Sequence, residues 1–140
     1  VVQSFARQDI ALYAHRDYIA RHGMPEGEDD LANHFFVSHD DPESRAPFSR
    51  WLRSRVPADH VVFRSTDSRV LEAAVTEGAG IGFMGCREAA LHPELVQVMP
   101  PRDEWASPLW LVTHVDLHRT AKVQALLRYL KDHIADWQDT

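Results

Sequence analysis

The chain has 140 residues with 44% hydrophobic content, which suffices for one globular unit and is too little for two independent domains. Its formal net charge of −6 at pH 7 argues against direct nucleic-acid binding, because DNA-contacting modules carry clustered Lys and Arg. One cysteine, Cys86, excludes an internal disulfide framework, and no apolar run approaches the roughly 20 residues that cross a bilayer, so we expect a cytoplasmic protein without membrane contact.

The first part of the chain predicts strands that alternate with short helices. The expected order is strand 10–13, helix 15–22, strand 34–38 and helix 47–55. Gly23 directly follows the first helix and suits its end, since glycine readily adopts the conformation that closes a helix. In the second helix Phe48, Trp51 and Leu52 share the inward face, whereas the arginines face solvent. An acidic segment at 28–32 suits a further helix start.

Residues 61–84 form the most informative run of the sequence. A strand at 61–63 leads into the polar cluster 65–68, which offers several N-caps for a helix over 68–77. Gly78 then stands where a helix end favours positive φ. A strand that ends in hydroxyl groups at a helix start places side-chain OH and backbone N–H groups near one volume. Such a turn suits a small anionic or polar ligand.

The remaining chain predicts four further elements. They are a short helix at 85–91, a strand at 95–99, a strand at 109–113 and a helix at 120–134. Val123, Leu126, Leu127 and Leu130 lie on the predicted buried side of the last helix. Strands alternating with helices indicate an α/β fold, with a mostly parallel sheet flanked by helices.

Taken together, these segments resemble the effector-binding domain of LysR-type transcriptional regulators. The resemblance covers nearly the whole chain and rests on residues 11–23 with Pro25, Asp30-Leu31 before a strand, 61–84, 95–100 and 109–131. It implies a periplasmic-binding-protein-like (type 2) fold, in which two α/β subdomains are joined by two crossing segments and hold a ligand in the cleft between them. A complete domain of this kind is considerably longer than this chain.

The resemblance also implies a division of the chain, which would be a partial effector-binding domain over 1–140. Residues before about 10 would lead into the first crossing, about 11–100 would form the second subdomain, and about 109–140 would return to the first subdomain. Most of the first subdomain and a winged helix-turn-helix would precede Val1. The chain has no initiator Met and no leader segment, which fits an origin within a longer protein.

The effector-binding residues implied by the resemblance come from three places. Ser65, Thr66 and Asp67 occupy the strand-to-helix turn, Met84 ends a strand near the same cleft, and Thr113 and His114 lie where the chain crosses back. Each has a structural alternative that the sequence leaves open. Hydroxyl groups and Asp67 can simply cap the helix, a histidine at a hinge can be a structural hydrogen-bonder, and methionine can be core.

The sequence favours binding over catalysis. The histidine spacings lack the Cys/His pattern of a structural zinc site, so we expect neither a metal nor a cofactor. Cys86 has no evident base or orienting partner, which leaves a small hydrolase as a weak alternative and predicts that the chain is not an enzyme and has no catalytic residues.

The predicted function is that of an effector-sensing regulatory domain. Its partners would be a small, anionic metabolite and further copies of the chain, in a dimer or tetramer joined through sheet-edge and helix surfaces. DNA would be bound only through the separate N-terminal domain. A solute-binding or transport protein of the same fold is the alternative, since fold alone does not fix function. That alternative requires a leader peptide.

Overall fold

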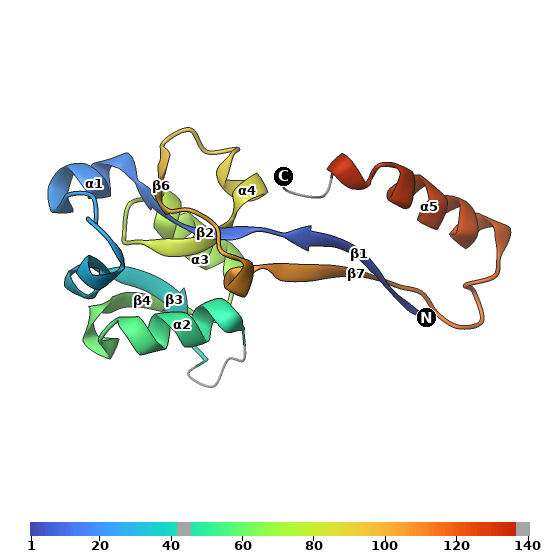
Figure 1. The fold of residues 1–140 in the computed structure, drawn as a ribbon, viewed down its shortest axis with the longest axis horizontal. Helices are drawn as coiled ribbons and strands as arrows, with labels where there is room; N and C mark the ends of the chain where they lie inside the picture. Colours follow the sequence, from blue (N-terminus) through green and yellow to red (C-terminus); the bar gives the residue numbers. More distant parts are fainter. Residues whose placement is uncertain (42–45, 137–140) are drawn as a thin grey trace.

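The computed structural model describes residues 1–41 and 46–136 (Figure 1). Its strands are β1 (Val2–Gln8), β2 (Ile10–His15), β3 (Phe36–His39), β4 (Val61–Ser65), β5 (Gly82–Gly85), β6 (Leu95–Met99) and β7 (Ser107–Val112). Its α-helices are α1 (Arg16–His22), α2 (Pro47–Arg55), α3 (Ser68–Thr76), α4 (Cys86–Ala89) and α5 (Ala121–Asp132). Short 3-10 helices are η1 (Glu28–Asn33), η2 (Ala58–His60), η3 (Asp103–Trp105) and η4 (Ile134–Asp136). Every predicted strand and helix has a counterpart, although the acidic segment at 28–32 forms the 3-10 helix η1.

The main sheet has the spatial order β4-β3-β5-β2-β6. β3 pairs with β4 in parallel, β2 pairs antiparallel with β5 and β6, and a parallel bridge between Phe36 and Ile81 joins the two groups. Four strands therefore point the same way, as expected for a mostly parallel sheet, whereas β2 runs against them. β2 follows β1 after one residue and starts with Ile10 opposite Gly85, at the end of β5.

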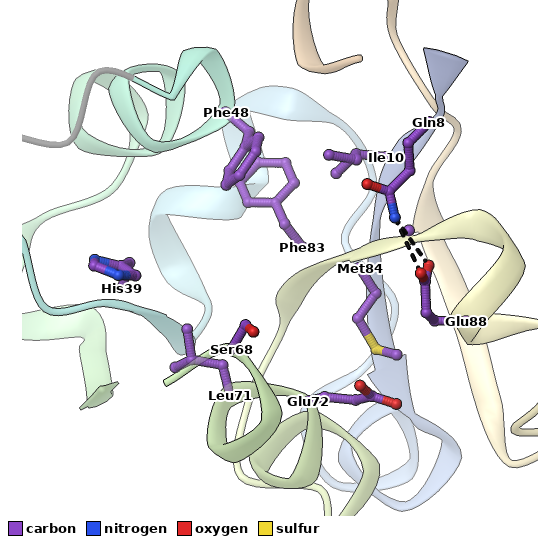
Figure 2. A pocket seen from close by; sticks show the side chains of 11 residues that line it. Gln8, Ile10, His39, Phe48, Ser68, Leu71, Glu72, Phe83, Met84 and Glu88 are labelled. Carbon is purple, nitrogen blue, oxygen red and sulfur yellow. Dashed lines mark hydrogen bonds between the residues drawn. The ribbon is translucent and has the colours of Figure 1, made fainter. Parts of the chain in front are cut away.

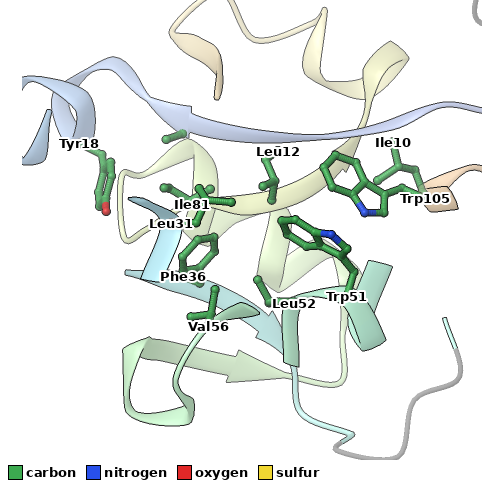
Figure 3. Close-up of a cluster of buried hydrophobic side chains, with 11 residues drawn as sticks. Ile10, Leu12, Tyr18, Leu31, Phe36, Trp51, Leu52, Val56, Ile81 and Trp105 are labelled. Atoms are coloured by element: carbon green, nitrogen blue, oxygen red, sulfur yellow. The ribbon is translucent and has the colours of Figure 1, made fainter. Parts of the chain in front are cut away.

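Both faces of this sheet are covered, and β2 contributes alternate residues to each. Ile10 and Leu12 point into one cluster, while Ala11 and Tyr13 point into the other, as the two-residue period of a strand requires. The first cluster lies largely between the sheet, α2 and η3 (Figure 3), and consists of Ile10, Leu12, Ala14, Tyr18, Leu31, Phe36, Trp51, Leu52, Val56, Ile81 and Trp105. The second includes Val75 of α3 and Ala89 of α4.

Helix α3 begins and ends as its sequence predicts. The Asp67 carboxylate caps it by accepting a hydrogen bond from the backbone N–H of Arg69 at 2.9 Å. Gly78, just beyond its end, has φ of 83°, which side chains other than glycine rarely adopt. A β-carbon at Gly82 would lie 2.6 Å from a methyl of Val75, so the absence of a side chain allows α3 to pack directly on β5.

The segment η3 is fixed to the sheet-bearing part of the chain by aromatic and ionic contacts. Trp105 is fully buried and packs edge-on against Trp51, with ring centroids 4.9 Å apart. Arg102 lies over the rings of both tryptophans and donates a hydrogen bond to Glu28 at 2.9 Å. Arg55 donates to the same carboxylate at 2.7 Å, so it is paired as well as partly exposed to solvent. The hydrogen bonds from Arg102 and then Arg55 hold the pKa of Glu28 below its ordinary value.

Strands β1 and β7 form a two-stranded antiparallel ribbon that leads away from the main sheet to α5 (Figure 1). The Thr120 hydroxyl caps α5 by accepting from the N–H of Val123. Leu127 is buried, whereas Leu126 is 58% exposed, so the prediction that Leu126 faces inward is wrong. The reason is that α5 extends beside a narrow ribbon, which covers only one side of the helix. Within the described ranges, no helix is long and apolar enough to cross a bilayer.

Candidate functional site

A hollow of about 350 Å³ lies where the main sheet meets the end of β1 (Figure 2). It is lined by Gln8, Ile10, His39, Phe48, Ser68, Leu71, Glu72, Phe83, Met84, Gly85 and Glu88. His39 ends β3, Ser68 begins the helix after β4, and Gly85 ends β5. The carboxyl ends of three strands that point the same way therefore meet here, which is the side of an open α/β sheet where ligands bind.

One wall of the hollow is aromatic and apolar. The rings of Phe48 and Phe83 lie 5.2 Å apart, centroid to centroid, and Phe83 is backed by Trp105 at 5.0 Å. Leu71 and Met84 extend this wall, and Met84 is almost fully buried. Because these side chains are held by the core behind them, the hollow offers a preformed surface for an apolar group.

The opposite wall carries a hydrogen-bonded pair that connects β1 to α4. The Gln8 amide donates to both carboxylate oxygens of Glu88, at 3.1 and 3.2 Å (Figure 2). Gly85 makes this pair possible, because a β-carbon there would collide with both side chains. The pair therefore connects the first crossing strand with the rim of the hollow.

A second carboxylate reaches the hollow from α3. Glu72 lines it one turn beyond Ser68 and also lies 3.2 Å from the Nε2 atom of His92. His39, at the end of β3, accepts a hydrogen bond from the backbone N–H of Asp41 through Nδ1 at 3.1 Å. The polar lining thus combines acidic side chains with the hydroxyl group of Ser68.

The predicted turn lies beside the hollow, but Ser65 and Asp67 hydrogen-bond within the turn itself. The Ser65 hydroxyl accepts from the N–H of Asp67 at 3.0 Å, and Asp67 caps α3 as described. Thr66 is exposed. Ser68, the last residue of the polar cluster, lines the hollow, and so does the predicted site residue Met84 at the end of β5. Ser68 belongs to the polar cluster 65–68 that marks the turn in the sequence.

Thr113 and His114 lie at the other end of the β1–β7 ribbon. The N–H of Thr113 donates to the carbonyl of Val1 at 2.9 Å, whereas Gln8, at the hollow, is paired in register with Ser107. The Thr113 hydroxyl is 2.8 Å from Nδ1 of His118, and the His114 Nδ1 atom accepts from a backbone N–H in the next turn. The structure therefore does not bring Thr113 and His114 to Met84 or Ser68.

The most important lining residues that the sequence did not single out are Gln8, Glu72 and Glu88. Each is a polar residue at a strand end or on a helix, where the sequence pattern predicts an ordinary solvent-exposed side chain. Their convergence depends on how α3 and α4 pack against the sheet, which no local pattern specifies. Among residues 1–41 and 46–136, no group of three or more His, Cys, Asp or Glu is arranged to hold a metal ion.

The described residues thus form an α/β domain with a hollow at the carboxyl ends of its strands. The LysR substrate binding domain family matches residues 1–135, and the chain belongs to this family. The predicted periplasmic-binding-protein-like type 2 fold is therefore confirmed.

Known relatives agree with this assignment. The chain is 26% identical over 125 residues to the probable HTH-type transcriptional regulator LtrA of Klebsiella pneumoniae, covering 84% of this chain and 40% of that protein. Its structure is similar to the regulatory domain of CrgA from Neisseria meningitidis, with a TM-score of 0.74 and 17% identity over 96% of this chain and 68% of that one. The regulatory domain of AphB from Vibrio vulnificus matches with a TM-score of 0.59 and 21% identity, over 93% of this chain and 68% of that one.

Proposed function

We propose that this chain is the effector-sensing part of a LysR-type transcriptional regulator and that its effector, a small molecule, binds in the hollow. The observation that carries the proposal is the presence of Gln8 in the lining, because a ligand there would touch the crossing strand β1 as well as the sheet. DNA would be bound by another domain of the regulator, in the cytoplasm. The role of this part is binding and not catalysis.

The ligand would act by shifting a conformational equilibrium. The two strands β1 and β7 would be the crossing segments, and they leave the main sheet side by side as a ribbon (Figure 1). The direction of this ribbon sets the position of α5, which follows β7. A ligand that binds better to one orientation of the ribbon favours that orientation by its difference in affinity. Met84 would contact the ligand, while Ser65, Thr66 and Asp67 would hold the turn that presents Ser68.

The division predicted from the sequence fits this scheme. Residues of about 11–100 would form the second subdomain, and about 109–140 would belong to the first. Large apolar side chains are exposed along the return segment, namely Trp110, Val112, Val115, Leu117, Leu126 and Tyr129. Such a face normally packs against other protein, and further chain of the first subdomain would cover it in the complete regulator.

The three methionines of the chain offer a direct test of ligand binding. Met84 lines the hollow, whereas Met24 is 43% exposed and Met99 lies in β6 outside the lining. With 13C-labelled methionine methyl groups, a small molecule that binds in the hollow should shift the Met84 signal and leave Met24 unchanged. Compounds that raise thermal stability but shift only Met24 or Met99 would contradict the proposed site.

Self-association would use the edge of the main sheet that β4 forms. β4 is paired on one side by β3, and Val62 and Phe63 on it are exposed, as is Val70 on the neighbouring α3. An apolar edge strand of this kind readily pairs with another strand. Light scattering should show a dimer or tetramer for the native chain and a smaller species for Val62→Lys. An unchanged mass for the variant would exclude this edge as the interface.

A further inference from the structure

We infer that the hollow selects an organic cation, such as a protonated amine on an apolar body, and that Glu72 and Glu88 determine this specificity. The inference rests on the proposed role of the hollow as the ligand site. It departs from the expectation of an anionic ligand, which came from the hydroxyl groups and the helix start in the turn.

The charge of the lining favours a cation. Among the described residues that line the hollow, two are glutamates and none is Lys or Arg. The glutamates come from different helices, and Figure 2 shows their carboxylates on either side of Met84. A negative ligand in the hollow would meet two like charges, whereas a positive group there would be attracted by both.

The helix start that could have held an anion is already supplied with a negative charge. The Asp67 carboxylate accepts the N–H of Arg69 and lies at the amino end of α3, where an anionic ligand would otherwise bind. An incoming carboxylate would have to approach this side chain. The Asp67 carboxylate thus offsets much of the attraction that the amino end of α3 would have for an anion.

The glutamates keep hydrogen-bonding capacity for a ligand. Glu88 accepts from the neutral amide of Gln8, and Glu72 lies beside His92, yet an ionised carboxylate offers about four acceptor sites. Phe48 and Phe83 supply the apolar part of the site, and aromatic ring faces also attract cations. An ammonium group joined to an aromatic ring therefore matches both walls of the hollow.

Three probes of similar shape and different charge separate the contribution of ligand charge from that of the aromatic ring. Benzylamine, benzyl alcohol and benzoate would be titrated against the full chain at neutral pH, with the Met84 methyl signal as the readout. Benzylamine should shift Met84 at the lowest concentration. Glu72→Gln and Glu88→Gln should each weaken the binding of benzylamine by about fivefold, because a charged hydrogen bond becomes a neutral one. Both amides keep an acceptor and the size of the native side chain.

The control removes one negative charge from helix α3 at a position that does not line the hollow. Glu77 is the exposed C-cap residue of α3, so Glu77→Gln should leave benzylamine binding unchanged. Equal weakening by Glu77→Gln would overturn the specific role of Glu72 and Glu88. If benzoate or benzyl alcohol shifts Met84 as readily as benzylamine, the ligand class is wrong and the hollow remains a binding site. If no probe shifts Met84, both the ligand class and the proposed site fail.

Discussion

Replacing Trp105 by Ala should cost about 4 kcal/mol of unfolding free energy, although Trp105 lies in a 3-10 turn outside the main sheet. Its side chain is fully buried, and truncating a buried large aromatic typically costs about 3–5 kcal/mol. Edge-on packing against Trp51 and Phe83, at 4.9 and 5.0 Å, raises the cost from the low end to the middle of this range, because each aromatic pair contributes about 0.5–1.5 kcal/mol beyond burial. The total unfolding free energy of a typical domain is only about 5–15 kcal/mol, so this single substitution removes a large part of it.

Trp105→Phe should be much milder, at about 1 kcal/mol. Within the described part of the chain the indole N–H of Trp105 has no hydrogen-bond acceptor, so its removal relieves a buried unpaired donor and offsets part of the lost packing. Urea unfolding followed by far-ultraviolet circular dichroism measures both variants. Trp110→Ala is the matched control, since Trp110 is 55% exposed and its loss should change stability by less than about 0.5 kcal/mol. A similar cost for Trp105→Ala and Trp110→Ala would refute the reasoning.

Two further predictions concern packing and pH. Gly82→Ala should lower the unfolding free energy by about 1–3 kcal/mol in urea titrations, because the new methyl group would lie 2.6 Å from Val75 and 2.8 Å from Val37; no loss would show that α3 can move away freely. The pKa of Glu28 is below its ordinary value of 4.5 in the folded state, so its stabilising effect is fully present above pH 4.5 and is lost as pH falls through the folded value. The urea midpoint of Glu28→Gln should therefore fall less between pH 6 and pH 3 than that of the native chain, and parallel profiles would contradict this.

Local patterns predicted the elements well wherever the signals were short-range. The bounds of α2 agree fully with the expected 47–55, since Pro47 marks a helix start and Trp51 and Leu52 define one inward face. β6 likewise matches 95–99, directly before Pro100. These signals require only a few neighbouring residues, so they need no knowledge of tertiary structure.

The candidate site was predictable only as a region. The polar cluster before α3 supplies Ser68 to the hollow, whereas Glu72 and Glu88 enter it because two helices approach the end of β5 from different places in the sequence. The same limitation explains Leu126, whose helical position is apolar by pattern and exposed in the structure. Helical periodicity identifies an apolar side of a helix, but what lies against that side depends on tertiary packing.

The two strands of the β1–β7 ribbon are anchored to the main sheet by different contacts. The chain leading into β7 is held by Trp105 in the core. The inner end of β1 is held by the Gln8–Glu88 hydrogen bonds, by the Arg7–Asp103 ion pair and by the N–H of Cys86, which donates to the carbonyl of Asp9. Gln8 and Ser107 are paired in the ribbon, so these two anchors lie at the same end of it. A ligand can compete for Glu88 but cannot reach a fully buried indole. A ligand in the hollow would therefore act first on the Gln8–Glu88 pair and leave the Trp105 anchor in place.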